Sequence, residues 1–272
     1  MTSRAEQTLG YTILGLFSII ALFPIVGIVL TSLQDPDGLA AFGTFDGLHF
    51  SNFADAWSEA NFGTYLRSSV IVTTVVVVIA GVLSILAGYA FGQMRFRGAT
   101  VLFYVFLLGL MVPMEAIIVP LYYDFREWGL TNTYWGLILP QIGTSVAFGT
   151  FWMRAFFRGV PRSLVEAARI DGASSWFTLW RVLLPLARPA VLTMTVLLFM
   201  WTWNEFLLAL VMVSDEGLRT APLGLSFFQG RNTSDLTLMA AGSVIVALPV
   251  VLLYVFLQRH FIRGMLAGAV KG

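Results

Sequence analysis

Charged side chains gather in one stretch of this chain, residues 158–189, and the binding chemistry of the chain is expected there. Six of the sixteen basic residues lie in or just before the stretch: Arg154, Arg158, Arg162, Arg169, Arg181 and Arg188. Glu166 could meet a cationic group on a partner, and near the start of a short helix its carboxylate is favoured by the helix dipole. Ala167 and Ala168 are small enough for another surface to approach closely. The stretch is therefore predicted to dock a soluble partner, with an interfacial helix lying on lipid as the alternative.

Two short helices are expected to position these side chains. Pro161 and Ser163 favour the start of the first helix, and Gly172 ends it because glycine permits a backbone turn that a Cβ would hinder. The second helix is expected over residues 174–184, with Pro185 as its end. Its apolar face is supplied by Trp176, Phe177, Leu179, Trp180 and Leu183. The two helices predict a compact knob, for which a membrane protein acting alone has little need.

Two carboxylates, those of Glu115 and Glu205, lie inside otherwise apolar stretches. A charge at such a depth costs about 3 kcal/mol on insertion scales, so both are expected to face the interior of a helix bundle or a wet cavity. Asn204 beside Glu205, with Trp201 nearby, gives the polar and aromatic mixture that suits a sugar. These four residues are candidates for a translocation pathway. The alternative is that the carboxylates satisfy backbone groups freed by nearby prolines, or form hydrogen bonds across a helix interface.

The sequence offers little for catalysis or metal binding. It has no cysteine, its two histidines are His49 and His260, and its only lysine is Lys271. Thiolate chemistry is thus excluded, and a histidine metal centre is not expected. No phosphate-binding loop, nucleophile elbow or HExxH pair occurs. We therefore predict a chain that is not an enzyme, has no catalytic residue and holds no metal or cofactor.

Composition indicates a membrane protein. Hydrophobic residues make up 58% of the chain, charged residues 11%, and the mean hydropathy is +0.82, whereas soluble domains carry about 25% charged residues. Six stretches are long and apolar enough to cross a bilayer as helices: approximately residues 9–33, 66–92, 101–123, 134–157, 190–213 and 238–257. Residues 1–272 are predicted to form a single all-α, polytopic membrane domain, with the 158–189 loop between the fourth and fifth helices.

Basic residues orient the predicted helices by the positive-inside rule. With the N-terminus in the cytoplasm, twelve Lys and Arg residues lie inside and four lie outside: Arg67, Arg126, Arg219 and Arg231. Both termini and the 158–189 loop are therefore predicted to be cytoplasmic. The net charge of +1 gives no argument for a nucleic-acid partner.

The spacing inside the 158–189 loop matches a known pattern. The loop reads Glu166-Ala167-Ala168, three residues, Gly172, nine residues, then Val182-Leu183-Leu184-Pro185. It resembles the EAA loop of bacterial ABC importer permeases, EAA-x3-G-x9-I-x-LP, with Val182 in the isoleucine position. Further segments are similar to carbohydrate importers: residues 120–122, 129–133, 171–173, 203–207 and 268–272. One departure is Arg67-Ser68-Ser69, where that family usually has Asn-Ser.

Six helices without a large outside insertion resemble the smaller permease of maltose-type sugar importers. The resemblance implies one half of a translocation pathway for a sugar or oligosaccharide, in the bacterial cytoplasmic (inner) membrane. The implied partners are a sister permease, a cytoplasmic ATPase dimer that binds ATP and Mg, and an extracytoplasmic solute-binding protein. Coupling to the ATPase is then expected through Glu166, Ala167, Ala168, Asp171, Gly172, Val182, Leu184 and Pro185.

The resemblance also implies two contacts outside the 158–189 loop. In maltose-type permeases the equivalent C-terminal tail enters the ATPase interface, so Gly268, Val270 and Lys271 are expected there; a frayed terminus is the alternative. The outside loop over residues 214–237 is expected to reach into the binding protein, and a plain connecting loop is the alternative. The residues suited to that contact are Gly224, Ser226, Gln229, Gly230 and Arg231.

Other functions fit the sequence less well. A glycerol-phosphate importer permease of the same family would favour arginines in the pathway, and none lies deep in a predicted helix. An ion- or proton-coupled secondary transporter could use Glu115 and Glu205 as proton carriers, but such proteins usually contain repeats and more helices. They also have no use for a docking loop. An intramembrane enzyme would need histidine, cysteine or serine constellations that the chain lacks.

Overall fold

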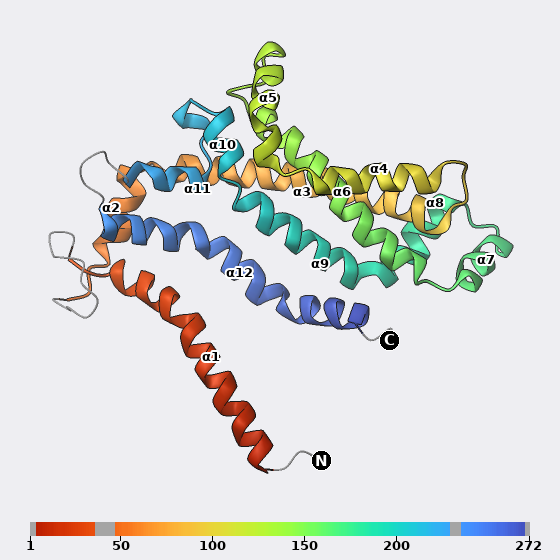
Figure 1. Cartoon of the computed structure of the whole chain (residues 1–272), viewed down its shortest axis with the longest axis horizontal. Helices are drawn as coiled ribbons and strands as arrows, with labels where there is room; N and C mark the ends of the chain where they lie inside the picture. The colour runs from red at the N-terminus through yellow and green to blue at the C-terminus, as the bar shows by residue number, and fades with distance from the viewer. Residues whose placement is uncertain (1–3, 36–46, 229–234, 270–272) are drawn as a thin grey trace. The chain divides into compact units, whose positions relative to one another are not determined.

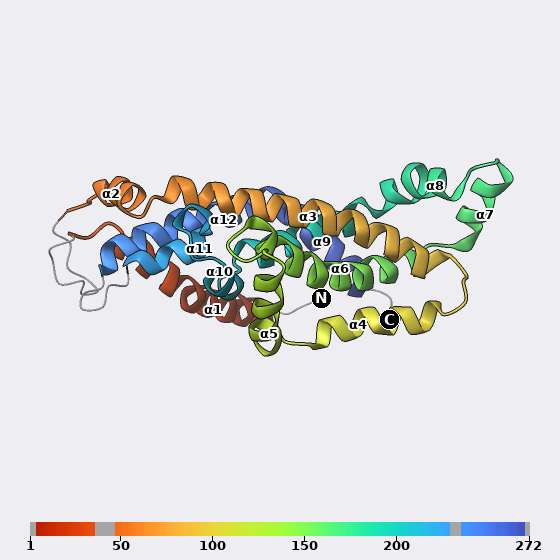
Figure 2. The ribbon, with the colours of Figure 1, turned by 90° about the horizontal axis from the view of Figure 1, so that it is seen from above.

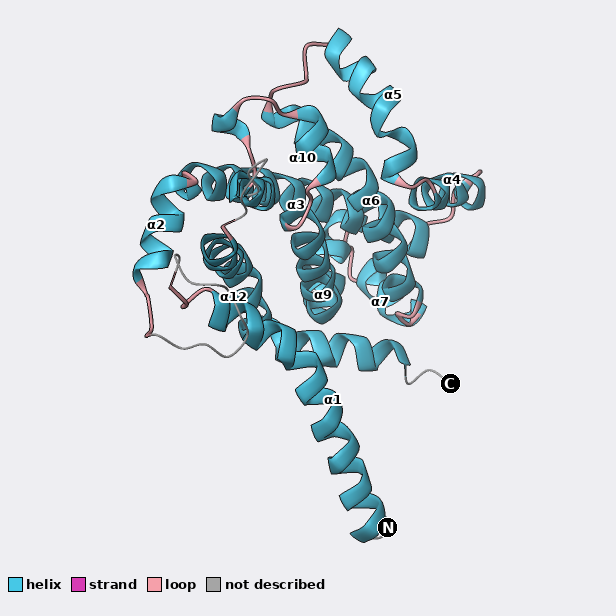
Figure 3. Ribbon diagram, turned by 60° about the vertical axis from the view of Figure 1, so that its left-hand side comes forward, coloured by secondary structure: helices cyan, strands magenta, loops and turns pink. Residues whose placement is uncertain are grey.

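The computed structural model describes residues 4–35, 47–228 and 235–269, which are helical or irregular and contain no strand (Figure 3). The chain divides into two compact units. The first comprises Met1–Gly63 with Leu223–Pro249, and the second comprises Thr64–Pro222 with Val250–Gly272. The prediction of one membrane domain over residues 1–272 stays a prediction.

The first unit contains α1 (Arg4–Thr31), α2 (Ser51–Glu59), η3 (Leu225–Phe228) and the first part of α12 (Leu236–Ala269). The side chain of Asn52 is fully buried, and its amide donates to the Ser32 carbonyl at 3.1 Å and the Gln34 carbonyl at 2.8 Å. These bonds tie α2 to the end of α1. Along its length α1 leaves almost all of its apolar side chains exposed, which suits a helix surrounded by lipid.

The second unit is built on α3 (Phe62–Gln93), α6 (Tyr134–Arg158) and α9 (Leu184–Trp203). Helix α6 packs against α9 and against α4 (Ala99–Met111), and α10 (Leu207–Met212) packs against α5 (Met114–Glu127) and α6. Figures 1 and 2 show these helices together. Short elements connect the longer ones: α7 (Arg162–Ile170), α8 (Ser175–Phe177), η1 (Thr178–Leu183), η2 (Glu216–Leu218) and α11 (Ala221–Gly224).

A stripe of small residues brings α3 against α6. On α3 the stripe is Ser84, Gly88 and Gly92, which are spaced four residues apart. A Cβ at Gly88 would lie 2.5 Å from the Cβ of Met153, and one at Gly92 would lie 2.8 Å from the Cβ of Phe157. Both helices therefore approach backbone to backbone, as small residues allow where lipid supplies no hydrophobic drive between helices.

Arg154 joins three helices of the second unit. Its guanidinium carbon lies 3.7 Å from the centre of the Phe103 ring on α4, and its Nε donates to the Phe91 carbonyl on α3 at 3.4 Å. The cation–π contact and the hydrogen bond stabilise the charge within the helix bundle. Arg154 is therefore part of the fold, unlike the exposed arginines of the 158–189 loop.

Among the described residues, four helical segments are long and apolar enough to cross a membrane: Glu6–Thr31, Phe62–Gln93, Ser175–Trp203 and Leu236–Gln258. The bent pair α4 and α5 makes a fifth if it counts as one span. The fourth predicted span coincides with α6, which is not among these segments. A membrane fold of apolar helices is confirmed, and the number six stays a prediction.

The third predicted span, residues 101–123, is two helices rather than one. Helix α4 ends at Met111, α5 begins at Met114, and their axes differ by 95°. Val112 is extended, with φ −84° and ψ 114°. The ring of Pro113 excludes the helical conformation for the residue before it, and proline has no N–H to continue the helix. Val112 and Pro113 therefore determine the bend between α4 and α5.

Pro185 does not end a helix, and that prediction is wrong. The helical chain continues without a break from Ser175 to Trp203. It passes from the π-helix η1 into α9, in which Pro185 is the second residue. At the start of an α-helix a proline fits because its missing N–H has no partner there to lose. Pro185 therefore lies inside a longer helix, next to Leu184, where π-helical hydrogen bonding changes to α-helical hydrogen bonding.

Candidate functional site

Helix α7 and the turn after it extend beyond the ends of α3 and α6 in the second unit (Figures 1 and 2). Gly172 has φ +81° in this turn. Its N–H donates to the Arg169 carbonyl at 3.0 Å, and the Ala173 N–H donates to the Ala168 carbonyl at 2.9 Å. These two bonds form a Schellman motif, which satisfies the last carbonyls of a helix. The prediction that Gly172 ends the helix is confirmed.

The residues of α7 divide between a buried face and exposed faces. Val165 and Ala168 are buried, whereas Glu166 and Ala167 are exposed. Ile170 is 86% exposed at the end of the helix, and sequence analysis did not single it out. The signal that could have identified Ile170 is a large apolar side chain four residues before a run of exposed polar and aromatic residues. Ala168 contributes to packing, so its small size serves the fold.

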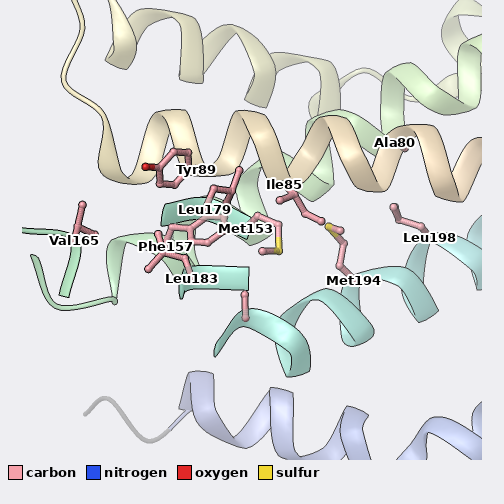
Figure 4. Close-up of a cluster of buried hydrophobic side chains, with 11 residues drawn as sticks. Ala80, Ile85, Tyr89, Met153, Phe157, Val165, Leu179, Leu183, Met194 and Leu198 are labelled. Carbon is pink, nitrogen blue, oxygen red and sulfur yellow. The ribbon is translucent and has the colours of Figure 1, made fainter. Parts of the chain in front are cut away.

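Val165 connects α7 to the core of the second unit, as Figure 4 shows. It belongs to one buried apolar cluster with Phe157 of α6 and with Leu179 and Leu183 of η1. The other members are Ala80, Ile85, Tyr89, Met153, Ala187, Met194 and Leu198. Helix α7, α6 and the π-helical η1 therefore share one close-packed core, and such interiors transmit strain.

The second half of the motif lies on η1 and α9. Val182 and Leu184 are half-buried and Pro185 is exposed, as is Asp171 after α7. Leu184 and Pro185 line an apolar hollow of about 350 Å³ together with Trp180 and Arg188. The predicted coupling residues thus lie on α7 and the turn after it, on η1 and at the start of α9, which share one core, and most of them remain accessible.

Glu205 caps a helix in the structure. One of its carboxylate oxygens accepts a hydrogen bond from the N–H of Leu208 at 2.8 Å, at the start of α10. The helix α9 ends at Trp203, and residues 204–206 form the break between α9 and α10. A carboxylate at a helix start satisfies a free N–H and is favoured by the helix dipole. Glu205 thus satisfies a backbone group, but one freed by the start of α10 and not by a proline as the alternative had it.

The other candidate pathway residues are mostly exposed. The amide of Asn204 donates to the Met200 carbonyl at 2.7 Å. Trp201 is 52% exposed, and its ring packs edge to face on Phe148 with 4.6 Å between the ring centres. Glu115 is exposed in the first turn of α5, just after the bend. Trp201, Asn204 and Glu205 therefore lie together at the end of α9, and Glu115 lies on a separate helix.

Polar residues fix the turn that follows α10. The side-chain oxygen of Asn132 accepts from the N–H of Ser214 at 3.1 Å and from the N–H of Asp215 at 2.8 Å. The Asn132 N–H donates to the Met212 carbonyl at 2.8 Å. Asn132 has φ +58°, a left-handed conformation that asparagine tolerates better than most residues. The segment 129–133 thus holds the end of α10 in place.

Two serines at the start of α3 hold the same loop. The hydroxyl of Ser68 is 3.0 Å from the hydroxyl of Tyr134, and the N–H of Ala221 donates to the oxygen of Ser69 at 2.8 Å. Both serines are buried. They belong to Arg67-Ser68-Ser69, where the sequence departs from the Asn-Ser of the resembling family. Ser69 binds the loop at Ala221, and the hydroxyl of Ser68 donates to the Gly217 carbonyl at 3.4 Å.

Asn132 offers a test of how firmly this turn is held. Asn132→Gly keeps the left-handed backbone and removes the accepting oxygen. Hydrogen exchange at the amides of Ser214 and Asp215 should therefore become about fivefold faster, since one hydrogen bond contributes about 1 kcal/mol. Hydrogen exchange followed by mass spectrometry measures this rate. Asn132→Asp keeps the acceptor and should exchange more slowly than the glycine variant. Equal exchange in wild type and Asn132→Gly would contradict the assigned role.

The structure describes only part of the remaining predicted contacts. Gly224 is buried at the end of α11, and the hydroxyl of Ser226 donates to the Leu223 carbonyl at 2.7 Å. Gly268 lies within α12, which continues to Ala269, twelve residues beyond the predicted end at residue 257. The other predicted residues lie outside the described part of the chain: Gln229, Gly230, Arg231, Val270 and Lys271.

The sequence model of one protein family, the binding-protein-dependent transport system inner membrane component, matches residues 80–266. The chain belongs to this family. The match starts within α3 and includes the whole 158–189 loop, so the elements that present α7 are those that the family shares.

Relatives and one solved structure extend the comparison to the whole chain. NgcG of Streptomyces coelicolor, a diacetylchitobiose uptake system permease protein, is 30% identical over 99% of this chain and 91% of its own length. AraQ of Halalkalibacterium halodurans, an arabinooligosaccharides transport system permease protein, is 33% identical over 97% of this chain and 95% of its own. The crystal structure of a bacterial ABC transporter involved in the import of the acidic polysaccharide alginate is similar with a TM-score of 0.82, 26% identity, and coverage of 96% of this chain and 99% of that chain.

Proposed function

We propose that this chain is a permease subunit of an ATP-driven ABC importer and forms half of the translocation pathway for a sugar or oligosaccharide. The family match supports the importer, and the names of the relatives support a carbohydrate cargo, because they give diacetylchitobiose and arabinooligosaccharides. The similar alginate importer carries an acidic polysaccharide. Neutral and acidic sugars both occur among these proteins, so carbohydrate is the class proposed.

The exposed helix α7 carries the proposal for how the chain is driven. Its exposed residues, Glu166, Ala167 and Ile170, are available to a partner, while Val165 joins it to the shared core. In the proposed complex a cytoplasmic ATPase dimer binds ATP and Mg and receives α7 in its surface. Closing of the ATPase displaces α7, and the core cluster passes the displacement to α6 and α9. The chain itself performs no catalysis in this scheme.

The other partners follow from the same scheme. A sister permease completes the pathway, and an extracytoplasmic binding protein delivers the sugar to the side opposite α7. Both termini and the 158–189 loop are cytoplasmic in this orientation. Glu115, Trp201, Asn204 and Glu205 are the proposed pathway residues, and Glu205 also holds the turn between α9 and α10 through its hydrogen bond to Leu208.

Uptake measured with independent control of ATP and the proton gradient tests the proposed function. The chain, isolated with its copurifying subunits and reconstituted in proteoliposomes, should accumulate a labelled oligosaccharide only with ATP on the ATPase side and with the binding protein on the other. An uncoupler should leave the rate within about a factor of two, since the ATPase supplies the driving force. Loss of uptake on collapse of the gradient at constant ATP would instead identify a secondary transporter.

A further inference from the structure

Trp180 lies in the π-helical η1 with its indole N–H buried. Across the described ranges of the chain this N–H has no hydrogen-bond partner. The indole N–H of Trp152 on α6, by contrast, donates to the Ala190 carbonyl at 2.9 Å. A buried indole N–H usually finds a partner, because leaving it unpaired costs free energy. The present position of Trp180 is therefore not one that a permanently packed tryptophan would favour.

The apolar hollow of about 350 Å³ lies directly beside Trp180. Ile85 contributes to its lining from α3. The continuous helix beside it contributes residues that recur every four positions: Trp180, Leu184, Arg188 and Leu192. The hollow therefore follows one side of that helix, and it reaches the surface at the exposed Arg188. Its volume can accept an indole ring.

The backbone near Trp180 has irregular hydrogen bonds on both sides of Leu184. Before Leu184, η1 has π-helical hydrogen bonds, each of which spans one residue more than an α-helical bond. After it, Pro189 has no N–H to donate within α9. Leu179 and Leu183 are almost completely buried and fix η1 to the core. The core thus closes one side of η1, and the hollow leaves space on another.

A change of η1 from π to α hydrogen bonding would turn Trp180 relative to α9. A π turn holds one residue more than an α turn, and one residue corresponds to a rotation of about 100° in an α-helix. Ala173 and Ser174 lie just before α8 and are not helical, so they can take up the extra residue. Leu184 follows η1 and keeps its place, so the indole ring moves relative to the lining of the hollow.

We propose that Trp180 is a two-position switch at the start of α9. In the first position, the one described here, η1 is π-helical and the hollow is open. In the second, η1 is α-helical, the indole ring fills the hollow, and its N–H reaches water at the opening beside Arg188. The short link over residues 171–174 joins this switch to α7, so a displacement of α7 acts on it. That connection rests on the proposed function, whereas the two positions of the ring do not.

Fluorine NMR of the intact complex, with this chain labelled by 5-fluorotryptophan, tests the switch. The signal of Trp180 is the one that W180F removes. Saturation transfer in the resting wild type should reveal a second, less populated Trp180 signal. Trapping the complex with ATP and vanadate should raise the population of that signal by about fivefold or more.

A pair of variants tests whether the second position lies in the hollow. L192F places a ring inside the hollow, so the second Trp180 signal should become about tenfold less populated, because two rings overpack the space. L186F adds the same ring at an exposed position outside the hollow and should leave both signals as in wild type. Equal populations in L192F and wild type would overturn the proposal.

The resting and trapped spectra separate this proposal from the proposed function. A single Trp180 signal, both at rest and after trapping of a complex that hydrolyses ATP, would overturn the switch and leave the importer standing. Two signals whose populations do not respond to trapping would overturn the connection to α7. A complex that hydrolyses no ATP would contradict the proposed function, and the resting spectra of wild type and L192F would still decide whether the ring has two positions.

Discussion

Gly172→Val should lower sugar-stimulated ATPase activity and uptake by about 5- to 30-fold, which corresponds to a backbone strain of about 1–2 kcal/mol. Gly172 has φ +81°, and no atom lies within 4 Å of the position that a Cβ would take. The loss therefore comes from the backbone, because a side chain disfavours the left-handed turn that closes the Schellman motif. The chain then leaves α7 in a different direction, and its docking face no longer fits the partner.

Gly98→Val is the matched control for Gly172→Val. Gly98 has φ +82° and is equally open, so valine brings the same strain, but it lies between α3 and α4, outside the 158–189 loop. The control should keep coupled activity close to that of wild type. ATP hydrolysis with and without the loaded binding protein, measured in proteoliposomes, distinguishes the two variants. Equal activity of Gly172→Val and wild type would show that the turn after α7 has no part in coupling.

Gly88→Val should destabilise the folded chain by about 3 kcal/mol or more. Adding carbon atoms to a well-packed contact typically costs about 1–3 kcal/mol and occasionally more, and valine adds three of them at a contact between two backbones. Even the Cβ of the valine would lie 2.5 Å from the Cβ of Met153 and 3.0 Å from the backbone nitrogen of Arg154. Backbone atoms cannot rotate away as a long side chain can. The helices α3 and α6 must separate instead, and the hydrogen bond from Arg154 to the Phe91 carbonyl on α3 is lost with them.

Gly81→Val provides the comparison within the same helix. Gly81 has no atom within 4 Å of its Cβ position, so valine enters open space there. Thermal unfolding in detergent, followed by size-exclusion chromatography with fluorescence detection, should show a midpoint several degrees lower for Gly88→Val and little change for Gly81→Val. Equal midpoints for the two variants would mean that α3 and α6 do not pack through the stripe of small residues.

Hydropathy and motif spacing predict the helical membrane fold and the helix end at Gly172, because both depend on residues that are close in sequence. The bend at Val112 and Pro113 could have been predicted by the same local rule, since proline constrains its predecessor. The stripe of Ser84, Gly88 and Gly92 was also visible, as small residues at intervals of four predict a close helix contact. Each signal lies within a few residues of the feature that it specifies.

Other features depend on residues that are distant in sequence. Ser69 binds the backbone at Ala221, and Asn132 binds it at Asp215, so no local pattern identifies either residue as the one that holds the loop. The helix through Pro185 also defied the local rule, because a π-helical turn before it changes the hydrogen-bond register. The polar hollow lined by residues 93–95 and by α7 likewise exists only because the folded chain brings these segments together.

The stripe of small residues also restricts how the second unit can move. Helices α3 and α6 are in backbone contact, and a slide of one along the other would bring α3 into collision with the Cβ atoms of Met153 and Phe157. The two helices should therefore tilt together as one rigid rod. Helix α9 meets α6 through larger side chains and starts in a π-helical turn, which can shift its register by one residue. Relative motion during a transport cycle is therefore expected between the α3–α6 rod and α9, with η1 as the joint.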